Sequence, residues 1–535
     1  MKKSVAILGG GISGLSSAYY LLRKSLSKGL NLDRVYLLEE SSRFGGWLHS
    51  KPIENVPNQT RVNQSNYFEL GPRTISLNSY AGINVLALVN SLGLSAQTKS
   101  IPKQSLSFKR RYIIIDDKLR LLPNSFRDLI VAEKPFRPFI AYLLQDLRRP
   151  RLRLNSESGD VSVHEFFQYR FGDDIANYLI NPLCIGITGG DSRLLSMRSV
   201  FPSILKKEQT YGSVVRGMFA KEDIWKDLKT DSLVAESIRD KWAVFSFENG
   251  IETLPKKLLS TLQEEFGSKI IVKPCTKVIG LRFNENGKNV VSAENDIDLE
   301  VDHIFSSIKA NSLARLLPSR YGLLKQTLES IETVSMAVVC LQFDETLIPI
   351  DKGFGFLIPS SEKSDILGVT FDSCIFPKPS TQVTVMLGGC WFKQLFGSTS
   401  NVDHKHLLQI SLKALDRYLQ IRKQPSHSHI DIHEVITIID LWFLCQLNIV
   451  QTILRSNQCN PMPLIYDSFS IFQDCIPQYH VGHHKKLQII ENEIRDLNLS
   501  LLGSSYYGFS VPDTILSAKT KSEQWIQSEL DEHSN

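Results

Sequence analysis

This 535-residue sequence lacks paired cysteines. Its eight cysteines stand apart, at positions 184, 275, 340, 374, 390, 445, 459 and 475, and no Cys-x-x-Cys motif occurs. We therefore expect no zinc or other metal site. Scattered single cysteines in a long chain also favour a reducing compartment over secretion.

The sequence also lacks an excess of charge of one sign. Its 61 basic and 56 acidic residues leave a net charge of +5, which is too even to predict nucleic-acid binding. It contains no convincing Ser-His-Asp arrangement, carboxylate pair or metal-ligand cluster. No signal peptide is expected, because an apolar strand already begins at Val5.

A glycine-rich motif is what the sequence does contain, between an apolar run and a helical pattern. Ser4–Leu8 predicts a buried parallel strand, and Ser16–Arg23 predicts the helix that follows it. Gly9 permits a tight turn, Gly11 lets the backbone approach a pyrophosphate, and Gly14 lets helix and strand pack closely. The start of the helix offers free N–H groups to phosphates.

A second apolar strand, Val35–Leu38, ends in an acidic residue. The interval from Gly14 to Glu39 is close to the spacing of about 20 residues at which a carboxylate accepts bonds from ribose hydroxyls. The same carboxylate would repel a 2′-phosphate, which argues against NADP. Arg43 and the pair Gly45-Gly46 follow, and in this they resemble flavoproteins of the glutathione-reductase-like class, in which the longer FAD lies along this segment.

A third segment that combines a glycine turn with the start of a helix lies near the end of the sequence. In GSSYYGFSVPDTILSA, residues 503–518, a glycine turn precedes a predicted helix that starts at Val511-Pro512-Asp513. An acidic residue in the first turn suits the positive end of a helix. Together with residues 250–308, these motifs predict a discontinuous FAD-binding domain.

These motifs stand in a longer series of specific strings. The strings are LGGGISGL, GGW, FELGPR (68–73), SMRSVFPS (196–203), GFGFLIPSSE (353–362), VTVMLGG (383–389) and CIPQY (475–479). In their order and spacing, from Val5 to about Ser517, the chain resembles the oxygen-dependent protoporphyrinogen oxidases, animal mitochondrial type, of the flavin-containing amine oxidase superfamily.

The resemblance implies an α/β fold. It combines a Rossmann-like FAD-binding domain of the glutathione-reductase/amine-oxidase type with a mixed α+β substrate domain and a helical membrane-associating subdomain. The expected boundaries are 1–80, 216–312 and 474–520 for the FAD-binding domain, 81–107 and 313–434 for the substrate domain, 108–215 for the helical subdomain, 435–473 for an atypical insert and 521–535 for a C-terminal tail.

The implied activity is the oxidation of protoporphyrinogen IX to protoporphyrin IX, the penultimate step of haem synthesis. Three two-electron steps would reduce three O2 to hydrogen peroxide. No side chain is expected to be catalytic, since the flavin N5 of a non-covalently bound FAD accepts the hydride. The resemblance assigns the cofactor to Gly9, Gly10, Gly11, Ile12, Ser13, Gly14, Glu39, Arg43, Gly45, Gly46, Trp47, Gly71, Pro72, Arg73, Thr74, Val278, His484, Gly503, Gly508, Ser510 and Val511.

A porphyrinogen is a wide apolar disc with two propionates on one edge, so its pocket needs apolar walls and a fixed cation. The resemblance assigns it to Arg111, Gly186, Phe354, Leu357, Thr370 and Met386. Four positions depart from the family pattern, and they bear on cofactor affinity rather than on the fold. They are Ile185, Lys309, His484 and Ala518.

Residues 133–154 interleave aromatic and aliphatic side chains with lysines and arginines. This apolar run is too short to span a bilayer, but basic flanks with aromatic anchors are typical of an interfacial membrane helix. A surface helix with a charged face is the alternative. The family resemblance implies a peripheral protein of the mitochondrial inner membrane, on the intermembrane-space side, that forms a homodimer.

Two other functions remain open from the sequence. A flavin amine oxidase has the same overall fold, and Tyr506-Tyr507 could form its aromatic cage. Arg111 and the GFGFLIP string argue against it. The other alternative is a flavin-binding protein without turnover, inactivated by residues 435–473.

The segment from Val435 to Gln473 interrupts the family register between Glu434 and Asp474. It could form a membrane span, because Val435–Leu454 is mostly apolar, although its polar residues weaken that interpretation. It could be a surface loop, but one that exposes many apolar side chains. The sequence favours a retained intron, since valine codons begin with GT and Phe472-Gln473 can be encoded as TTTCAG.

Overall fold

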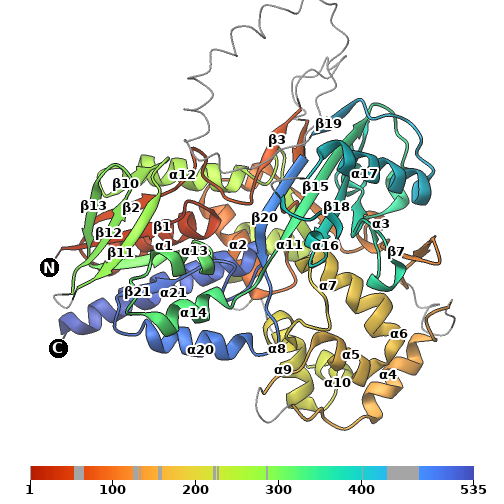
Figure 1. Cartoon of the computed structure of the whole chain (residues 1–535), viewed down its shortest axis with the longest axis horizontal. Helices are drawn as coiled ribbons and strands as arrows, with labels where there is room; N and C mark the ends of the chain where they lie inside the picture. Colours follow the sequence, from red (N-terminus) through yellow and green to blue (C-terminus); the bar gives the residue numbers. More distant parts are fainter. Residues whose placement is uncertain are drawn as a thin grey trace, which may run out of the picture.

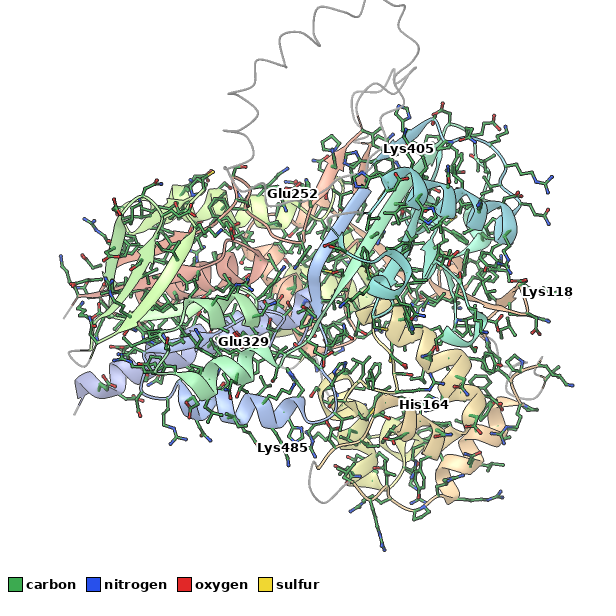
Figure 2. All side chains as sticks on the ribbon, in the orientation of Figure 1. Lys118, His164, Glu252, Glu329, Lys405 and Lys485 are labelled. Carbon is green, nitrogen blue, oxygen red and sulfur yellow. The ribbon has the colours of Figure 1, made fainter. Side chains whose placement is uncertain are left out.

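The structure is a computed structural model that describes residues 2–53, 66–123, 131, 134–154, 159–220, 225, 228–284, 287–399, 402–429 and 469–534. Most of the predicted insert therefore lies outside the described residues, and only 469–473 fall within them. Figure 1 shows a part with both termini on the left, a sheet-rich part at the upper right and a helical part at the lower right. Figure 2 shows the side chains on the same ribbon.

The first part is built on a parallel five-stranded sheet. Its strand order is β10-β2-β1-β14-β21, and each neighbouring pair runs parallel. The strands are β1 (Lys3–Leu8), β2 (Leu32–Leu38), β10 (Ile270–Lys273), β14 (His303–Ser306) and β21 (Leu499–Leu501). Strands from three distant stretches of sequence thus form one sheet, and the predicted α/β class is confirmed.

Helices cover this sheet because its central strands are apolar on both faces. Val5, Ala6 and Ile7 of β1 have no exposed surface. The helix α1 spans Ile12–Lys28, so it begins four residues before the predicted start at Ser16. It packs against α21 (Val511–Ser534) and α12 (Thr253–Phe266).

Smaller elements complete this part of the chain. The strands β11 (Val278–Phe283), β12 (Asn289–Ala293) and β13 (Ile297–Val301) form an antiparallel sheet, beside α13 (Ala310–Leu316), α14 (Gly322–Glu329) and α20 (His483–Glu493). The strand β9 (Trp242–Phe247) pairs with β5 (Ile75–Ser76) and β6 (Thr98–Pro102). The helix α2 (Tyr80–Ser91) packs on α21 and on α11 (Ser232–Arg239).

The sheet-rich part contains an eight-stranded sheet in the order β19-β15-β18-β17-β16-β7-β8, with β20 also paired to β15. Its strands are β15 (Thr333–Phe343), β16 (Gly355–Leu357), β17 (Gly368–Thr370), β18 (Thr381–Gly389), β19 (His427–His429), β20 (Phe469–Pro477), β7 (Tyr112–Ile115) and β8 (Lys118–Leu121). One face packs on α17 (His404–Leu419) and encloses a core around Val339, Leu341 and Val385.

The predicted helical subdomain 108–215 is helical only in its later part. Residues 112–121 form β7 and β8, because Tyr112 and Ile113 pair with Phe356 and Leu357 of the eight-stranded sheet. The longer helices that follow are α4 (Phe139–Arg148), α5 (Val163–Phe171), α7 (Asn181–Thr188) and α9 (Pro202–Tyr211), with α10 (Val214–Met218) after them.

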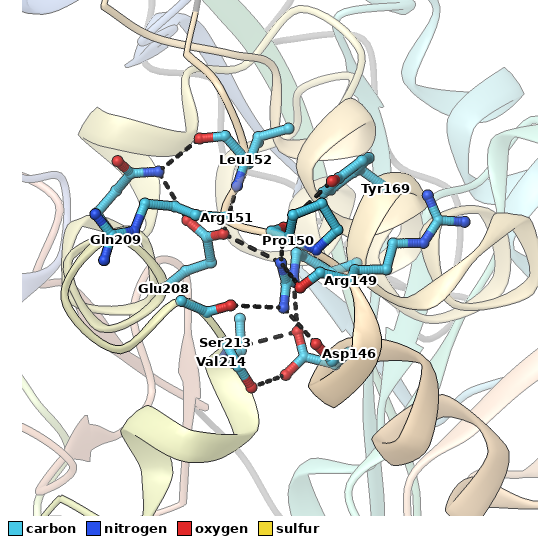
Figure 3. Close-up of polar contacts among 12 residues, drawn as sticks. Asp146, Arg149, Pro150, Arg151, Leu152, Tyr169, Glu208, Gln209, Ser213 and Val214 are labelled. Atoms are coloured by element: carbon cyan, nitrogen blue, oxygen red, sulfur yellow. Dashed lines mark hydrogen bonds and ion pairs between the residues drawn. The ribbon is translucent and has the colours of Figure 1, made fainter.

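A buried arginine holds this helical part together. The guanidinium of Arg170 is fully buried and pairs with Asp146 at 2.5 Å and with Glu208 at 3.2 Å. It also donates to the backbone carbonyl of Pro150 at 2.8 Å. Figure 3 shows the Asp146 and Glu208 carboxylates among these contacts. Three helices and the turn after α4 are therefore fixed by one side chain.

Replacing that side chain tests its contribution to stability. Arg170→Ala should lower the free energy of unfolding by about 3–5 kcal/mol, because two carboxylates remain buried without a cation. Urea unfolding followed by circular dichroism measures the change. The control is Arg239→Ala, whose ion pair with Asp240 is exposed, and which should leave the free energy of unfolding nearly unchanged. Equal effects of the two substitutions would contradict this role for Arg170.

Candidate active site

The glycine turn after β1 depends on a close backbone approach at Gly14. A Cβ atom on this residue would lie 1.9 Å from the carbonyl oxygen of Gly9, so only glycine fits. Gly9 itself has φ +96°, a conformation that other residues rarely adopt. These two glycines bring the start of α1 directly against the end of β1, as the motif predicts.

The N-terminus of α1 has unused hydrogen-bond donors. Gly11 is the N-cap residue, and no side chain caps the helix. The Ser13 hydroxyl is buried and has no hydrogen-bond partner among the described residues. The free N–H groups and the positive helix end fit a pyrophosphate. The residues present therefore fit a dinucleotide cofactor, and the assignment of its phosphates to Gly10, Gly11, Ile12 and Ser13 stays a prediction.

Glu39 lies beside this turn, at the end of β2. Its carboxylate accepts the Gly10 N–H at 2.7 Å and the Ser41 N–H at 2.9 Å. The side chain therefore lies where the motif predicts a ribose-binding acid. The neighbouring Glu40 is exposed and pairs with Lys277 at 3.3 Å. Val278, assigned to the cofactor, begins β11 close by, since the N–H of Thr276 donates to the Glu39 carbonyl.

The loop with Gly45 and Gly46 folds back onto the glycine turn. The N–H of Gly45 donates to the Gly10 carbonyl at 2.9 Å, and Gly11 forms a parallel bridge with Gly45. Arg43 donates to the carbonyls of Phe44 and Leu48, both at 3.2 Å, and pairs with Glu252 at 3.3 Å. The contacts of Arg43 are thus internal to the protein, and they shape the loop that approaches the predicted cofactor.

The segment Gly71–Thr74 continues the same surface. A Cβ on Gly71 would lie 2.1 Å from the carbonyl oxygen of Trp47, so the two assigned segments touch. Pro72 and Thr74 are half-buried. Lys309, one of the departures from the family pattern, holds its ammonium 5.7 Å from the centre of the Trp47 ring.

The C-terminal turn meets this surface from the other side of β1. Gly503, with φ +88°, packs against Ser307 at the end of β14, next to the glycine turn. The hydroxyl of Tyr479 donates to the carbonyl of Ser504 at 2.5 Å and accepts the N–H of Gly508 at 3.0 Å. Ser510 accepts the N–H of Asp513 and so caps α21. The start of this helix at Val511 agrees with the prediction.

Three of the departures occupy defined surroundings. His484 lies at the first turn of α20 with its Nδ1 3.7 Å from the carboxylate of Asp160, toward the helical part. Ala518 is fully buried in α21, and Ile185 is 1% exposed in an apolar cluster. The assigned role of His484 at the cofactor remains a prediction.

Three of the six predicted substrate residues share one face of the eight-stranded sheet. Leu357 pairs with Gly368, which pairs with Met386, so side chains at these positions lie on the same side. Thr370 is two residues along β17 from Gly368 and shares that face. A Cβ on Gly186 of α7 would lie 2.8 Å from Leu357, which places the helix over this wall. Phe354 instead joins a second cluster with Phe108 and Phe376.

Arg111 lies at the edge of that second cluster. Its guanidinium carbon is 4.8 Å from the centre of the Phe108 ring and 5.6 Å from that of Phe354. Within the described part of the chain no carboxylate pairs with it; the protein atoms around it lower the pKa of its guanidinium, although the residue itself is exposed at the surface. The preceding Arg110, in contrast, pairs with Asp351 at 2.8 Å. Among the described residues, Arg111 is therefore a cation held on aromatic rings without a carboxylate partner.

Asp372 is a site residue that the sequence did not indicate. Its carboxylate accepts the Nε of Arg73 at 2.7 Å, and the hydroxyls of Thr370 at 3.0 Å and Thr384 at 2.5 Å. The Nη2 of Arg73 remains buried without a hydrogen-bond partner among the described atoms. Asp372 therefore links Arg73, which is assigned to the cofactor, with Thr370, which is assigned to the substrate. Asp372 and Arg73 lie 299 positions apart in the chain.

A polar cluster next to Arg73 also went unpredicted. Lys99 donates to the Tyr67 hydroxyl at 2.7 Å, and Lys378 donates to Gln382 at 2.6 Å. Burial lowers the pKa of both ammonium groups, that of Lys378 to about 8, and raises the pKa of Glu69 to about 7. The cavity among them, about 30 Å³, has the size of one water molecule. No signal in the sequence marks these residues as neighbours.

Fold and site together define a flavoprotein of the dinucleotide-binding class. Residues 12–443 match the flavin-containing amine oxidoreductase family. The protoporphyrinogen oxidases of Bos taurus and Homo sapiens are 33% and 32% identical to the chain, each over 97% of both sequences. The chain belongs to the protoporphyrinogen oxidases within the flavin-containing amine oxidoreductases, and FAD is its cofactor.

Solved structures agree with this fold. A crystal structure of a candidate protoporphyrinogen oxidase from Exiguobacterium superimposes with a TM-score of 0.70 at 21% identity, covering 99% of both chains. Cyclohexylamine oxidase from Brevibacterium oxydans gives a TM-score of 0.60 at 12% identity, with 99% of this chain and 100% of that chain covered. At these identities the two structures support the fold alone.

The bridge through Asp372 can be tested by removing its charge. Asp372→Asn leaves one acceptor oxygen where three donors converge, so the free energy of unfolding should fall by roughly 1.5–3 kcal/mol. The visible spectrum of the bound flavin should shift as Arg73 loses its anchor. Asp351→Asn is the control, because that carboxylate pairs with Arg110 at the surface and is 59% exposed. If Asp372→Asn and Asp351→Asn have the same stability and the same flavin spectrum, Asp372 is not a positioning residue.

Proposed function

We propose that this protein oxidises protoporphyrinogen IX to protoporphyrin IX with O2 as electron acceptor, in the penultimate step of haem synthesis. The observation that carries the proposal is the placement of Arg111. A cation without a carboxylate partner among the described residues lies over the rings of Phe108 and Phe354, and this combination of charge and apolar surface suits a wide apolar disc with carboxylates on one edge. The names of the curated relatives support the same substrate.

The side chains divide the binding between an apolar surface and one charge. Leu357 and Met386 belong to one apolar cluster, and Gly186 lets α7 approach the Leu357 side chain closely. Arg111 would bind a propionate through paired N–H groups, which fixes the orientation of the disc. Because the Arg111 guanidinium already lies on the rings of Phe108 and Phe354, its side chain loses little conformational entropy when the ligand binds.

The cofactor would be held along the path already described. Gly9–Gly14 would hold its phosphates and Glu39 its ribose, while Trp47, Gly71–Thr74 and the turn Gly503–Val511 would surround the ring system. FAD, when bound, supplies the two-electron oxidation. The protein supplies orientation and a surface from which water is excluded, and none of its side chains needs to act as acid or base.

Anaerobic mixing distinguishes this function from its alternatives. Protoporphyrinogen should bleach the yellow protein, whereas benzylamine and spermine should leave its flavin oxidised. Bleaching by the amines alone would establish an amine oxidase instead. A flavin that no compound reduces would establish a flavin-binding protein without turnover.

Arg111→Ala tests the substrate-binding role separately. Loss of a charge-assisted hydrogen bond costs about 1.5–3 kcal/mol, so KM should rise roughly 10- to 150-fold while kcat falls less. Arg110→Ala is the matched control, because its guanidinium is already paired with Asp351. If both substitutions leave KM unchanged, or raise it equally, Arg111 does not bind the propionate.

We also propose that the protein associates peripherally with the inner mitochondrial membrane, on the intermembrane-space side, as a homodimer. Ile140 and Leu144 on α4 are 51% and 40% exposed, and basic residues follow at Arg148 and Arg149. Such a combination supports interfacial binding. No helix among the described residues is long and apolar enough to cross a membrane. Flotation with anionic vesicles, and loss of flotation in Ile140→Ser/Leu144→Ser, measures the association.

A further inference from the structure

Two strands occupy one edge of β15 in succession. In the antiparallel pairing with β19, Cys340 lies opposite His429, Leu341 opposite Ser428, and Gln342 opposite His427. In the pairing with β20, Val339 lies opposite Phe469 and Met336 opposite Phe472. Figure 1 shows β20 alongside β15. The pairing thus passes from β19 to β20 between two adjacent residues of β15.

The registers of the two strands match. One step along β15, from Cys340 to Val339, corresponds to a step from His429 to Phe469 on the other side. The segment 430–468 separates these positions in the sequence and lies outside the described residues. A chain shortened here by the length of that segment would keep every pair on both sides in place, whereas a deletion longer or shorter by one residue would not.

Removal of any segment as long as 430–468 at this point keeps the register. The alternation of side chains in the sequence indicates at which residue such a segment begins. The sequence HSHIDIHE, residues 427–434, continues a period of two beyond the end of β19. In the matched register, Ile430 and Ile432 would lie opposite Val339 and Ala337, which are fully buried in the core on the α17 side. The period ends at Val435, where an apolar run starts. The segment 435–473 has the same length as 430–468.

The segment 435–473 also differs from the rest of the chain in composition. Its only charged residues are Asp440, Arg455 and Asp467, whereas 22% of the whole chain is charged. Connections between strands normally leave a strand at its end, on the surface, rather than between two adjacent pairing positions. The register of the described strands and the composition of this segment therefore both indicate that residues 435–473 are not part of the strand along β15.

We propose that the fully folded enzyme is a shorter chain in which Glu434 is followed directly by Asp474. In that chain, residues 427–434 and 474–477 form one strand along β15, which keeps the register shift between Val334 and Met336. The segment 435–473 is excluded before translation, as an intron retained in this sequence, since its first codon begins with GT and its last two can be written TTTCAG. The inference does not depend on the substrate, because its tests measure folding and transcript length.

Deletion variants test the register. Removal of residues 435–473 should raise the midpoint of thermal unfolding by roughly 3 °C or more over the full chain and slow hydrogen exchange along β15. Removal of 430–468 has the same length and should give a similar gain. Removal of 435–472, one residue shorter, shifts the register by one and should not.

The comparison among these variants decides the structural part of the proposal. A full chain as stable as the 435–473 deletion would overturn it, and so would an equal gain from the 435–472 deletion. Sequencing of mature transcripts across the Glu434–Asp474 junction decides the origin. Transcripts that lack the codons for 435–473 support an intron, and transcripts that all retain them overturn it.

Discussion

The contact between Gly14 and the carbonyl oxygen of Gly9 constrains the whole cofactor side of the molecule. Because no Cβ fits there, α1 starts directly at the end of β1, and its free N–H groups lie next to the loop Gly45–Gly46 and the ends of β2 and β14. A side chain at this position would push the helix away and separate these groups. The approach of two backbone segments thus creates a site for phosphates without any charged side chain.

The cofactor side and the substrate wall are connected by a few polar contacts. Arg73 comes from the segment next to Trp47, and Asp372 begins the short helix α15 (Asp372–Ile375) after β17. Their ion pair joins the two parts of the chain. Thr370 and Thr384 share the same carboxylate. A shift of the eight-stranded sheet would therefore move Asp372 and with it Arg73. The ion pair thus fixes the position of the substrate wall relative to the cofactor side.

The sequence predicted those features that depend on local pattern. The glycine turn, Glu39 and the start of the last helix at Val511 all follow from neighbouring residues, and the structure places them together. Substrate-wall residues such as Leu357 and Met386 were assigned through the family resemblance, and the sheet register brings them to one face.

The remainder could not be predicted because it depends on contacts between distant residues. Asp372 and Arg73 are 299 positions apart, and the Lys99 and Lys378 cluster joins a strand of one part with a loop of another. Nothing in the sequence around Arg170 distinguishes this buried arginine from an exposed one. The short strands β7 and β8 fall within the predicted helical subdomain because their pairing partner, β16, lies far away along the chain. Pattern alone gives no signal for such pairings.

The parallel sheet has a consequence for synthesis on the ribosome. The glycine turn leaves the ribosome well before α21, yet α1 packs against α21, and Lys3 pairs with Glu529 at 2.8 Å. The first sheet cannot be completed and covered until β21 and α21 have emerged, so the nascent chain must carry exposed apolar strands until then. A chain terminated early would keep its phosphate turn but lack the helix that covers it.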